Sequence, residues 1–475
     1  MKNQILIVTV LICLAAGMVY GSGSQAAATD VPVIQWGLAG DPPPNLAEAE
    51  KVISDYTESK IGVRVEFPFF SLADSATRKN TMINSGEYWD MWYLIGVTYF
   101  DWARMGVFAD LTDLISKYPG LTRTIPQTLW DGFKVDNRIY GIPTYKDSSA
   151  AHYAIWNEAL VKKYNIDVNS MKTMADYDRA LRTIKAGEGA RFYPVHAAKN
   201  EPNHRFLYPL DYDLSFGLTI VGVKASDPNC RVVNMLEDPE YVEYLRYFRR
   251  WYQDGIINPD APVLDRPPIN GAVTLGQGWP LAWDDAYAER QGWEHAVANL
   301  QYGPIYSTNT VLTYTGISAN SKHVEACLKF LELANTDRKL RDMLAYGIEG
   351  KDFEYVTPVT IRKLTNSWSM AAYQQATFFI MSTVHGTPNP WDEVKQLNEQ
   401  ARASAVYGFA FNRTPVQNEY TNCSAIWNRF KPQLYNGAVD PDVVVPQVIA
   451  ELKANGLDRI IAEAQRQIDA WKQTR

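Results

Sequence analysis

A strand, a helix and a second strand follow one another near the start of the chain, and this order restricts the fold more than any other feature. Residues 33–36 are apolar, as in a buried strand, residues 46–56 place apolar side chains at helical spacing, and residues 63–67 alternate as a strand does. Two strands joined by a helix are normally parallel neighbours in one sheet, and parallel sheets occur in α/β folds. The start of the chain therefore predicts an α/β protein.

Helix and strand patterns remain mixed to the C-terminus, without a solenoid repeat or a low-complexity linker. Thr173 and Asp176 can cap one helix, Asp238 and Pro239 can begin another, and residues 457–471 form an apolar stripe. A length of 475 residues suggests two to three domains, and 46% hydrophobic residues are enough for large cores. We predict two α/β lobes joined by several short strands that act as a hinge.

The N-terminus has the three parts of a secretory signal peptide. Lys2 precedes an apolar run over 5–20, and small residues follow over 21–28. We predict a signal peptide over 1–21, with cleavage near Gly21 or later, up to about residue 28; an uncleaved anchor is the alternative. Ile12 precedes Cys13 where a lipid attachment site needs a small residue, so we expect an exported protein without a lipid anchor, periplasmic or extracellular.

Charge and cysteine content exclude several classes of protein. The formal net charge is -7, and loss of Lys2 with the signal makes it -8, so nucleic acid is not the expected partner. Cys230, Cys327 and Cys423 have no metal-like spacing, and the histidines are scattered, so we expect neither metal nor cofactor. Cys327 lies on an apolar helical stripe and should be buried, whereas a bridge between Cys230 and Cys423 stays open.

Several segments, taken in order, resemble the family 1 extracellular solute-binding proteins, and most closely the oligosaccharide-type subgroup with an extra C-terminal domain of unknown function. Each segment alone is weakly specific, but their order covers nearly the whole chain after the signal. Residues 137–143 depart slightly, with Asn-Arg where the family pattern has Gly-Lys. The segments that carry the resemblance are 40–41, 85–90, 106–115, 137–143, 251–260, 316–323, 346–350 with 353–355, 386–390 and 408–411.

The resemblance implies a type II periplasmic-binding-protein-like fold that closes on its ligand between two lobes. Lobe 1 would comprise residues 30–145 and 310–355, and lobe 2 residues 146–309 and 356–475, with the extra domain at about 375–475. The implied function is capture of a carbohydrate, mostly an oligosaccharide in this family, and delivery to the membrane permease of an ABC importer. The protein would be a monomer and not an enzyme.

Flat aromatic rings and planar polar groups suit the apolar faces and hydroxyls of a sugar. The segment 279–285 has two Trp and two carboxylates. If it is extended, Trp279 and Trp283 face one way and Asp284 the other. A buried strand followed by a helix cap is the alternative for this segment.

Other candidates lie at expected strand ends and crossings. Trp36 ends the first strand and Asp41 follows it; Trp89 and Asp90 precede the strand at 91–95; Tyr145 follows the first expected crossing. Core filling by the rings and capping by the carboxylates are the alternatives.

Two further candidates lie later in the chain. Glu349 stands among glycines and is either structural or a ligand contact, and Trp368 flanks the C-terminal part. Asn389 and Trp391 rank below them.

Two other functional classes stay open. A glycosidase would need two opposed carboxylates, and adjacent residues such as Asp284 and Asp285 point apart in a strand. The sequence has no GxSxG, phosphate-binding loop or dinucleotide fingerprint. A sensor that presents its ligand to a membrane receptor would use the same cleft, and a non-sugar ligand is also compatible with the sequence.

Overall fold

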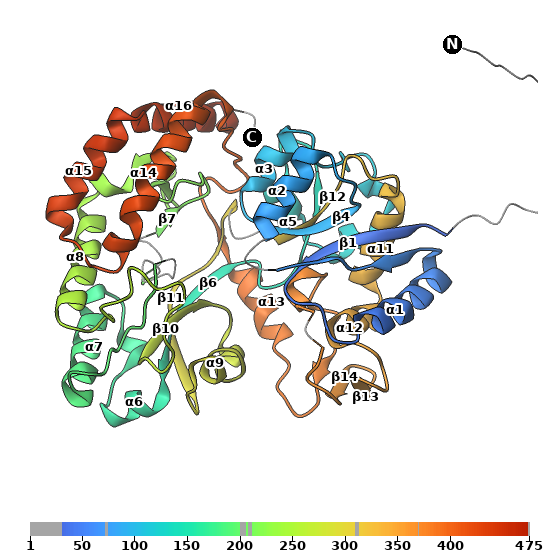
Figure 1. The fold of residues 1–475 in the computed structure, drawn as a ribbon, viewed down its shortest axis with the longest axis horizontal. Coiled ribbons are helices and arrows are strands. Elements are labelled where there is room, and N and C mark those ends of the chain that lie inside the picture. The colour runs from blue at the N-terminus through green and yellow to red at the C-terminus, as the bar shows by residue number, and fades with distance from the viewer. Residues whose placement is uncertain are drawn as a thin grey trace, which may run out of the picture.

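Two α/β lobes lie side by side in the computed structural model (Figure 1). The structure describes residues 31–71, 75–199, 206–207, 211–308, 313–368 and 370–473. The predicted signal peptide lies outside these residues. Within them, no helix is long and apolar enough to cross a membrane.

Lobe 1 is built on a six-stranded sheet with the order β2-β1-β4-β12-β5, in which β3 also pairs with β1. The strands β2, β3 and β4 are parallel to β1, as the opening pattern predicts, whereas β12 is antiparallel to β4 and β5. The strands of this sheet are β1 Val33–Ala39, β2 Arg64–Glu66, β3 Phe69–Phe70, β4 Met91–Ile95, β5 Gly141–Pro143 and β12 Thr313–Ile317.

Both faces of this sheet are covered, which explains why β4 is apolar throughout. Met91 and Tyr93 belong to the core on one face, and Trp92 belongs to the core on the other, because successive side chains of a strand point to opposite faces. The first face carries α1 Leu46–Ile61, α4 Pro119–Thr124, α11 Val324–Thr336 and α12 Arg338–Tyr346, and the second carries α2 Ser75–Ser85 and α3 Thr98–Arg104. The helix α5 Gln127–Phe133 contributes to both, with Leu129 and Trp130 on the first face and Phe133 on the second.

Lobe 2 contains a four-stranded sheet with the order β10-β6-β11-β16 and a small sheet with the order β7-β8-β9. The larger sheet consists of β6 Ala150–Asn157, β10 Val273–Gln277, β11 Ala296–Tyr306 and β16 Arg402–Ala403, and the smaller one of β7 Tyr212–Asp213, β8 Val221–Lys224 and β9 Val233–Asn234. Its helices are α6 Glu158–Lys163, α7 Met174–Glu188, α8 Pro239–Gln253, α9 Glu289–Gln291, α14 Gln417–Tyr435, α15 Pro441–Ala454 and α16 Leu457–Lys472.

Local sequence signals set several of these helix boundaries. Thr173 and Asp176 form the predicted capping box of α7, and Asp238 caps α8 with Pro239 in its first turn. The last three helices form one core with α8, so the extra C-terminal domain packs on lobe 2 (Figure 1).

The chain crosses between the lobes after β5, after β11 and after α13 Trp391–Gln400. The second crossing runs partly outside the described residues. Residues 353–384, with β13 Phe353–Thr357, β14 Thr360–Lys363 and β15 Thr383–Val384, pack beside α12. The predicted boundary gave residues 356–475 to lobe 2, whereas the structure places residues 356–368 and 370–384 with lobe 1, because β14 pairs with both β13 and β15.

The three described cysteines are buried and free. Cys327 lies in the lobe 1 core, as its stripe predicts. Cys230 contacts the carbonyl of Ala405, and Cys423 contacts the carbonyl of Leu452, so the bridge that the sequence left open does not form.

Candidate ligand-binding site

The carboxyl ends of β1 and β4 meet at the edge of the lobe 1 sheet where the crossings begin. Gly40, at φ +126°, follows β1 and leads into the exposed Asp41. β4 ends at Ile95, which is largely exposed, and Gly96 turns the chain with φ +92°. Open α/β sheets bind ligands at such edges.

Aromatic side chains from both lobes gather beside this edge. The ring of Tyr145 lies 4.3 Å from that of Phe379, and Phe378 lies 5.1 Å from Trp391, measured between centroids. Trp279 of lobe 2 lies 6.3 Å from Trp391. We call Tyr145, Trp279, Phe379 and Trp391 the junction aromatics; all four are half-buried.

A second aromatic pair joins Tyr93, the middle residue of β4, to Tyr373. The rings of Tyr93 and Tyr373 are 5.8 Å apart, and Tyr373 is 41% exposed. The buried hydroxyl of Tyr93 has no hydrogen-bond partner among the described residues. Burial raises the pKa of Tyr93, and the nearby Tyr373 and Asp147 raise it further, so the group stays a neutral hydroxyl. Such a group can exchange hydrogen bonds with a ligand hydroxyl.

Polar side chains fix the first crossing. Asp147 accepts a bond of 2.6 Å from Lys146, and Gln277 at the end of β10 donates to the Asp147 carbonyl at 3.0 Å. Asn398 of α13 donates to the Lys146 carbonyl at 2.7 Å and accepts from the Ser149 amide at 2.9 Å. The crossing that carries Tyr145 is therefore held by both lobe 2 and α13.

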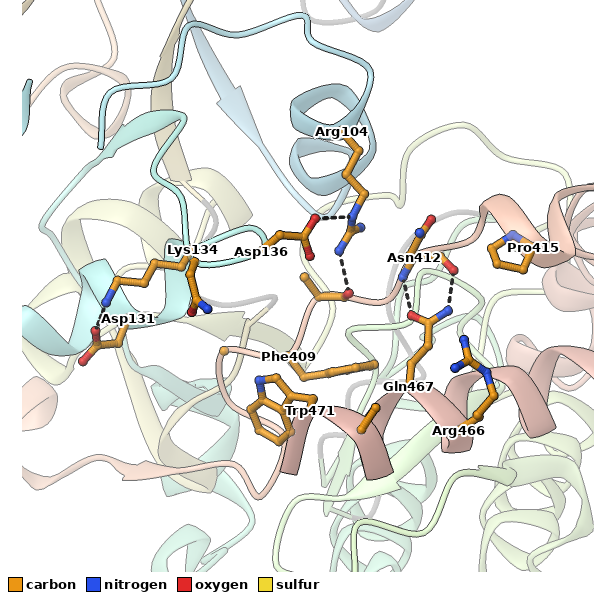
Figure 2. A pocket seen from close by; sticks show the side chains of 14 residues that line it. Arg104, Asp131, Lys134, Asp136, Phe409, Asn412, Pro415, Arg466, Gln467 and Trp471 are labelled. Carbon is orange, nitrogen blue, oxygen red and sulfur yellow. Dashed lines mark hydrogen bonds and ion pairs between the residues drawn. The ribbon is translucent and has the colours of Figure 1, made fainter. Parts of the chain in front are cut away.

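A pocket of about 780 Å³ lies elsewhere, between α3 and α5 of lobe 1 and the C-terminal domain. Figure 2 shows Arg104 between Asp136 and the backbone of the C-terminal segment, where it donates to the Ala410 carbonyl at 3.0 Å. Gln467 of α16 pairs with both backbone groups of Asn412.

The charged groups of this pocket have ionic partners within the protein. Arg104 pairs with Asp136, Lys134 with Asp131, and Arg466 with Glu463. Beside the pocket, Arg413 forms an ion pair with Asp101 of α3. The pair of Arg413 with Asp101 and the bond from Arg104 to the Ala410 carbonyl join the two lobes here. Among the described residues, no group of three or more His, Cys, Asp or Glu could hold a metal ion.

A family model described as bacterial extracellular solute-binding protein matches residues 51–388, which is more than half of the chain. The chain belongs to this family. A second model, a domain of unknown function named DUF3502, matches residues 405–473. Both matches confirm the resemblance seen in the sequence, including the extra C-terminal domain of this solute-binding protein.

Similar proteins extend over nearly the whole chain. A carbohydrate ABC transporter substrate-binding protein of Streptococcus pneumoniae serotype 4 is 26% identical, covering 96% of this chain and 94% of the relative. The crystal structure of the N-glycan transport solute binding protein NgtS of S. pneumoniae has a TM-score of 0.82 at 24% identity, covering 92% of this chain and 98% of NgtS. An HMO-binding, ABC-transporter-associated solute binding protein of Bifidobacterium longum infantis has a TM-score of 0.62 at 14% identity, over 93% and 99% of the two chains. The structural likeness confirms the two-lobed fold.

The structure places three predicted site residues of this solute-binding protein in structural roles. Trp36 is 0% exposed in the lobe 1 core, and Trp89 is 4% exposed and stacks on Trp92 at 3.7 Å. Asp90 is fully buried and accepts bonds from the Gln35 amide, Tyr88 and Ser321. Sequence could not separate them from ligand contacts, because residues distant in the chain bury them.

The segment after Trp279 is not extended, which corrects the predicted facing of its side chains. Residues 280–282 form a 3₁₀ turn and residues 283–288 a π-helical turn. Trp283 is 7% exposed and packs on Tyr153 at 4.5 Å, so it fills a core. Trp279 stays half-buried among the junction aromatics. The side chain of Asp284 lies outside the described residues.

The remaining predicted residues divide between the junction and the body of lobe 1. Asp41 and Tyr145 lie at the strand edge and the first crossing. Glu349 pairs with Lys339 of α12 at 3.0 Å, and the Trp368 indole donates to the Leu344 carbonyl at 3.1 Å. Both of these have partners within lobe 1 that account for them structurally.

Sequence reasoning missed most of the polar and aromatic groups at the junction. Tyr93 lies inside an apolar strand and Tyr373 in a segment without a strong pattern, so neither gave a signal. Trp391 follows Pro390 at the start of α13, and this helix start is the one sequence signal that could have made Trp391 a stronger candidate for ligand contact.

Proposed function

We propose that this protein captures a carbohydrate, namely an oligosaccharide, outside the cytoplasm and delivers it to an ABC importer. Membership of the extracellular solute-binding family supports the general role. The S. pneumoniae relative named as a carbohydrate transporter component, and NgtS, whose structures include complexes with Man1GlcNAc and Man5GlcNAc, support the class of cargo.

The observation that carries the proposal is the aromatic gathering at the crossings. Trp279 comes from lobe 2, whereas Tyr145, Phe379 and Trp391 come from the first crossing, from lobe 1 and from α13. Rings from separate elements can hold a sugar on more than one face, and the Tyr93 hydroxyl can bond to its rim. We assign ligand contact to the junction aromatics with Tyr93, Tyr373 and Asp41.

The mode of action that we propose is lobe closure about the crossings, without chemical change of the ligand. The closed protein then docks on membrane permease subunits as a monomer. Export by the N-terminal segment, without a lipid anchor, completes the proposal.

A thermal-shift screen of the protein from residue 29 onward tests the function. The panel contains Man1GlcNAc, Man5GlcNAc, kestose and monosaccharides, with amino acids and short peptides as controls. A ligand that binds only the folded state raises Tm in a concentration-dependent way. We expect a shift with one class of oligosaccharide; a shift with peptides alone would contradict the proposal.

A further inference from the structure

The segment 371–379, which we call the strap, contacts the end of β1, the first crossing and β4. The side-chain amide of Gln374 holds both backbone groups of Ala39, at the end of β1, at 2.7 Å each. The amide of Phe378 donates to the Tyr145 carbonyl at 3.0 Å. Through Tyr373 and Phe379 the strap also supplies two of the rings assigned to the ligand.

A buried guanidinium holds the strap from behind. Arg341 of α12 is 0% exposed. Its Nε donates to the Thr377 carbonyl at 2.8 Å, one terminal nitrogen to Gln375 Oε1 at 2.6 Å, and the other to the Ala372 carbonyl at 3.1 Å. All three acceptors belong to the strap, and none is a carboxylate.

A carboxylate next to Arg341 holds the chain just beyond the strap. Asp342 accepts from the amide and the hydroxyl of Ser382 at 2.8 and 2.7 Å, and from the hydroxyl of Tyr355 at 2.9 Å. Burial raises the pKa of Asp342, and the bonds from Ser382 oppose this shift.

Packing alone does not account for these two charges. Burying an ion is costly, and an apolar side chain of similar volume is often as stable or more stable at such a position. A guanidinium presents its donors in a fixed planar fork, so it determines the placement of every acceptor that it binds. The buried guanidinium of Arg341, despite its desolvation penalty, therefore holds the strap in one conformation.

We propose that Arg341 and Asp342 are positioning residues, which set Tyr373 and Phe379 in place for the ligand without touching it. This inference rests on the proposed function. It follows that specificity depends partly on two buried residues of α12 that lie behind the binding surface, because an aromatic group binds well only when it is already in place.

Three variants test the inference: Arg341→Met, which keeps the volume and removes the fork, Arg341→Lys, which keeps the charge, and Asp342→Asn. Arg362→Met is the matched control, because Arg362 lies on the same lobe in an exposed pair with Glu354. Binding of the best saccharide from the screen is measured by calorimetry, and folding by circular dichroism and thermal melting.

We expect Arg341→Met to weaken binding by at least about tenfold, Arg341→Lys to recover part of that loss, and Arg362→Met to leave binding unchanged. Arg341→Met should cost less in a Tyr373→Ala background, because the ring that it positions is then absent. A purely structural role would give the same cost in both backgrounds.

Equal affinity of folded Arg341→Met and wild-type protein would overturn the inference and leave the proposed function intact. If Arg341→Met does not fold, Arg341→Lys and Asp342→Asn decide in the same way. A wild-type protein that binds no saccharide would instead overturn the proposed function itself.

Discussion

Trp279 and Trp283 lie four residues apart, but substitution by Ala should mainly weaken ligand binding at Trp279 and mainly lower the free energy of unfolding at Trp283. Trp279 is half-buried among the junction aromatics, whereas Trp283 is almost fully buried against Tyr153. Trp279→Ala removes a ring that we assign to the ligand. Trp283→Ala removes a ring from a core.

The magnitudes follow from these positions. Loss of a stacking ring weakens binding by about 1–3 kcal/mol, or roughly 5–150-fold in Kd. Removal of a buried Trp lowers the free energy of unfolding by about 3–5 kcal/mol. Trp279→Ala should lower the free energy of unfolding by less than Trp283→Ala does, because the Trp279 ring is partly exposed to solvent and buries less apolar area.

Calorimetric titration gives Kd for the best saccharide, and urea denaturation gives the free energy of unfolding. Trp283→Phe is the fallback if Trp283→Ala is too unstable to purify. An unchanged Kd for folded Trp279→Ala would refute the assignment of the junction aromatics. An unchanged stability of Trp283→Ala would refute the burial argument.

Three further substitutions test other parts of the structure. Burial lowers the pKa of Lys79 from 10.5 to about 8, so the unfolded chain holds this proton more tightly than the folded protein does. As the pH increases from 8 to 10.5, the free energy of unfolding of wild-type protein should therefore rise, and that of Lys79→Met should rise less. Parallel pH profiles of the two proteins in urea denaturation would contradict this. The ion pair of Arg413 and Asp101 joins the C-terminal domain to lobe 1. A double-mutant cycle with Arg413→Ala and Asp101→Ala should show a coupling of about 1 kcal/mol in the free energy of unfolding, whereas strictly additive effects would show that the pair does not stabilise the protein. Gly437 has φ +73°, and an added Cβ would lie 2.0 Å from the Phe248 carbonyl oxygen. Gly437→Ala should therefore lower the free energy of unfolding by more than about 1 kcal/mol, measured by urea denaturation, and an unchanged midpoint would contradict this.

Local pattern was enough to predict the elements whose causes are local. The helix α8 begins where Asp238 and Pro239 predict, and its stripe of Tyr241, Tyr244 and Phe248 is buried. The run at 91–95 is a strand with both faces covered. Strand–helix alternation likewise predicted the parallel part of the lobe 1 sheet.

The site could be predicted only in part, because exposure depends on residues far away in sequence. The sequence predicts Trp36 at the end of the first strand, but this residue lies in the middle of β1, where Phe330 packs on it at 5.7 Å and covers it. Trp279 follows β10 by two residues and remains partly exposed. The strap shows the same limit. Its place is determined by Arg341, an arginine that sequence alone would assign to the surface of a helix.

The central claim is that this protein binds an oligosaccharide between its lobes, and a titration read by both calorimetry and small-angle scattering tests it most directly. We expect a saturable heat that fits one ligand bound per protein. The account also predicts a smaller radius of gyration when ligand is present, because the lobes close. Absence of heat with every saccharide in the panel, or binding of peptides alone, would contradict the account.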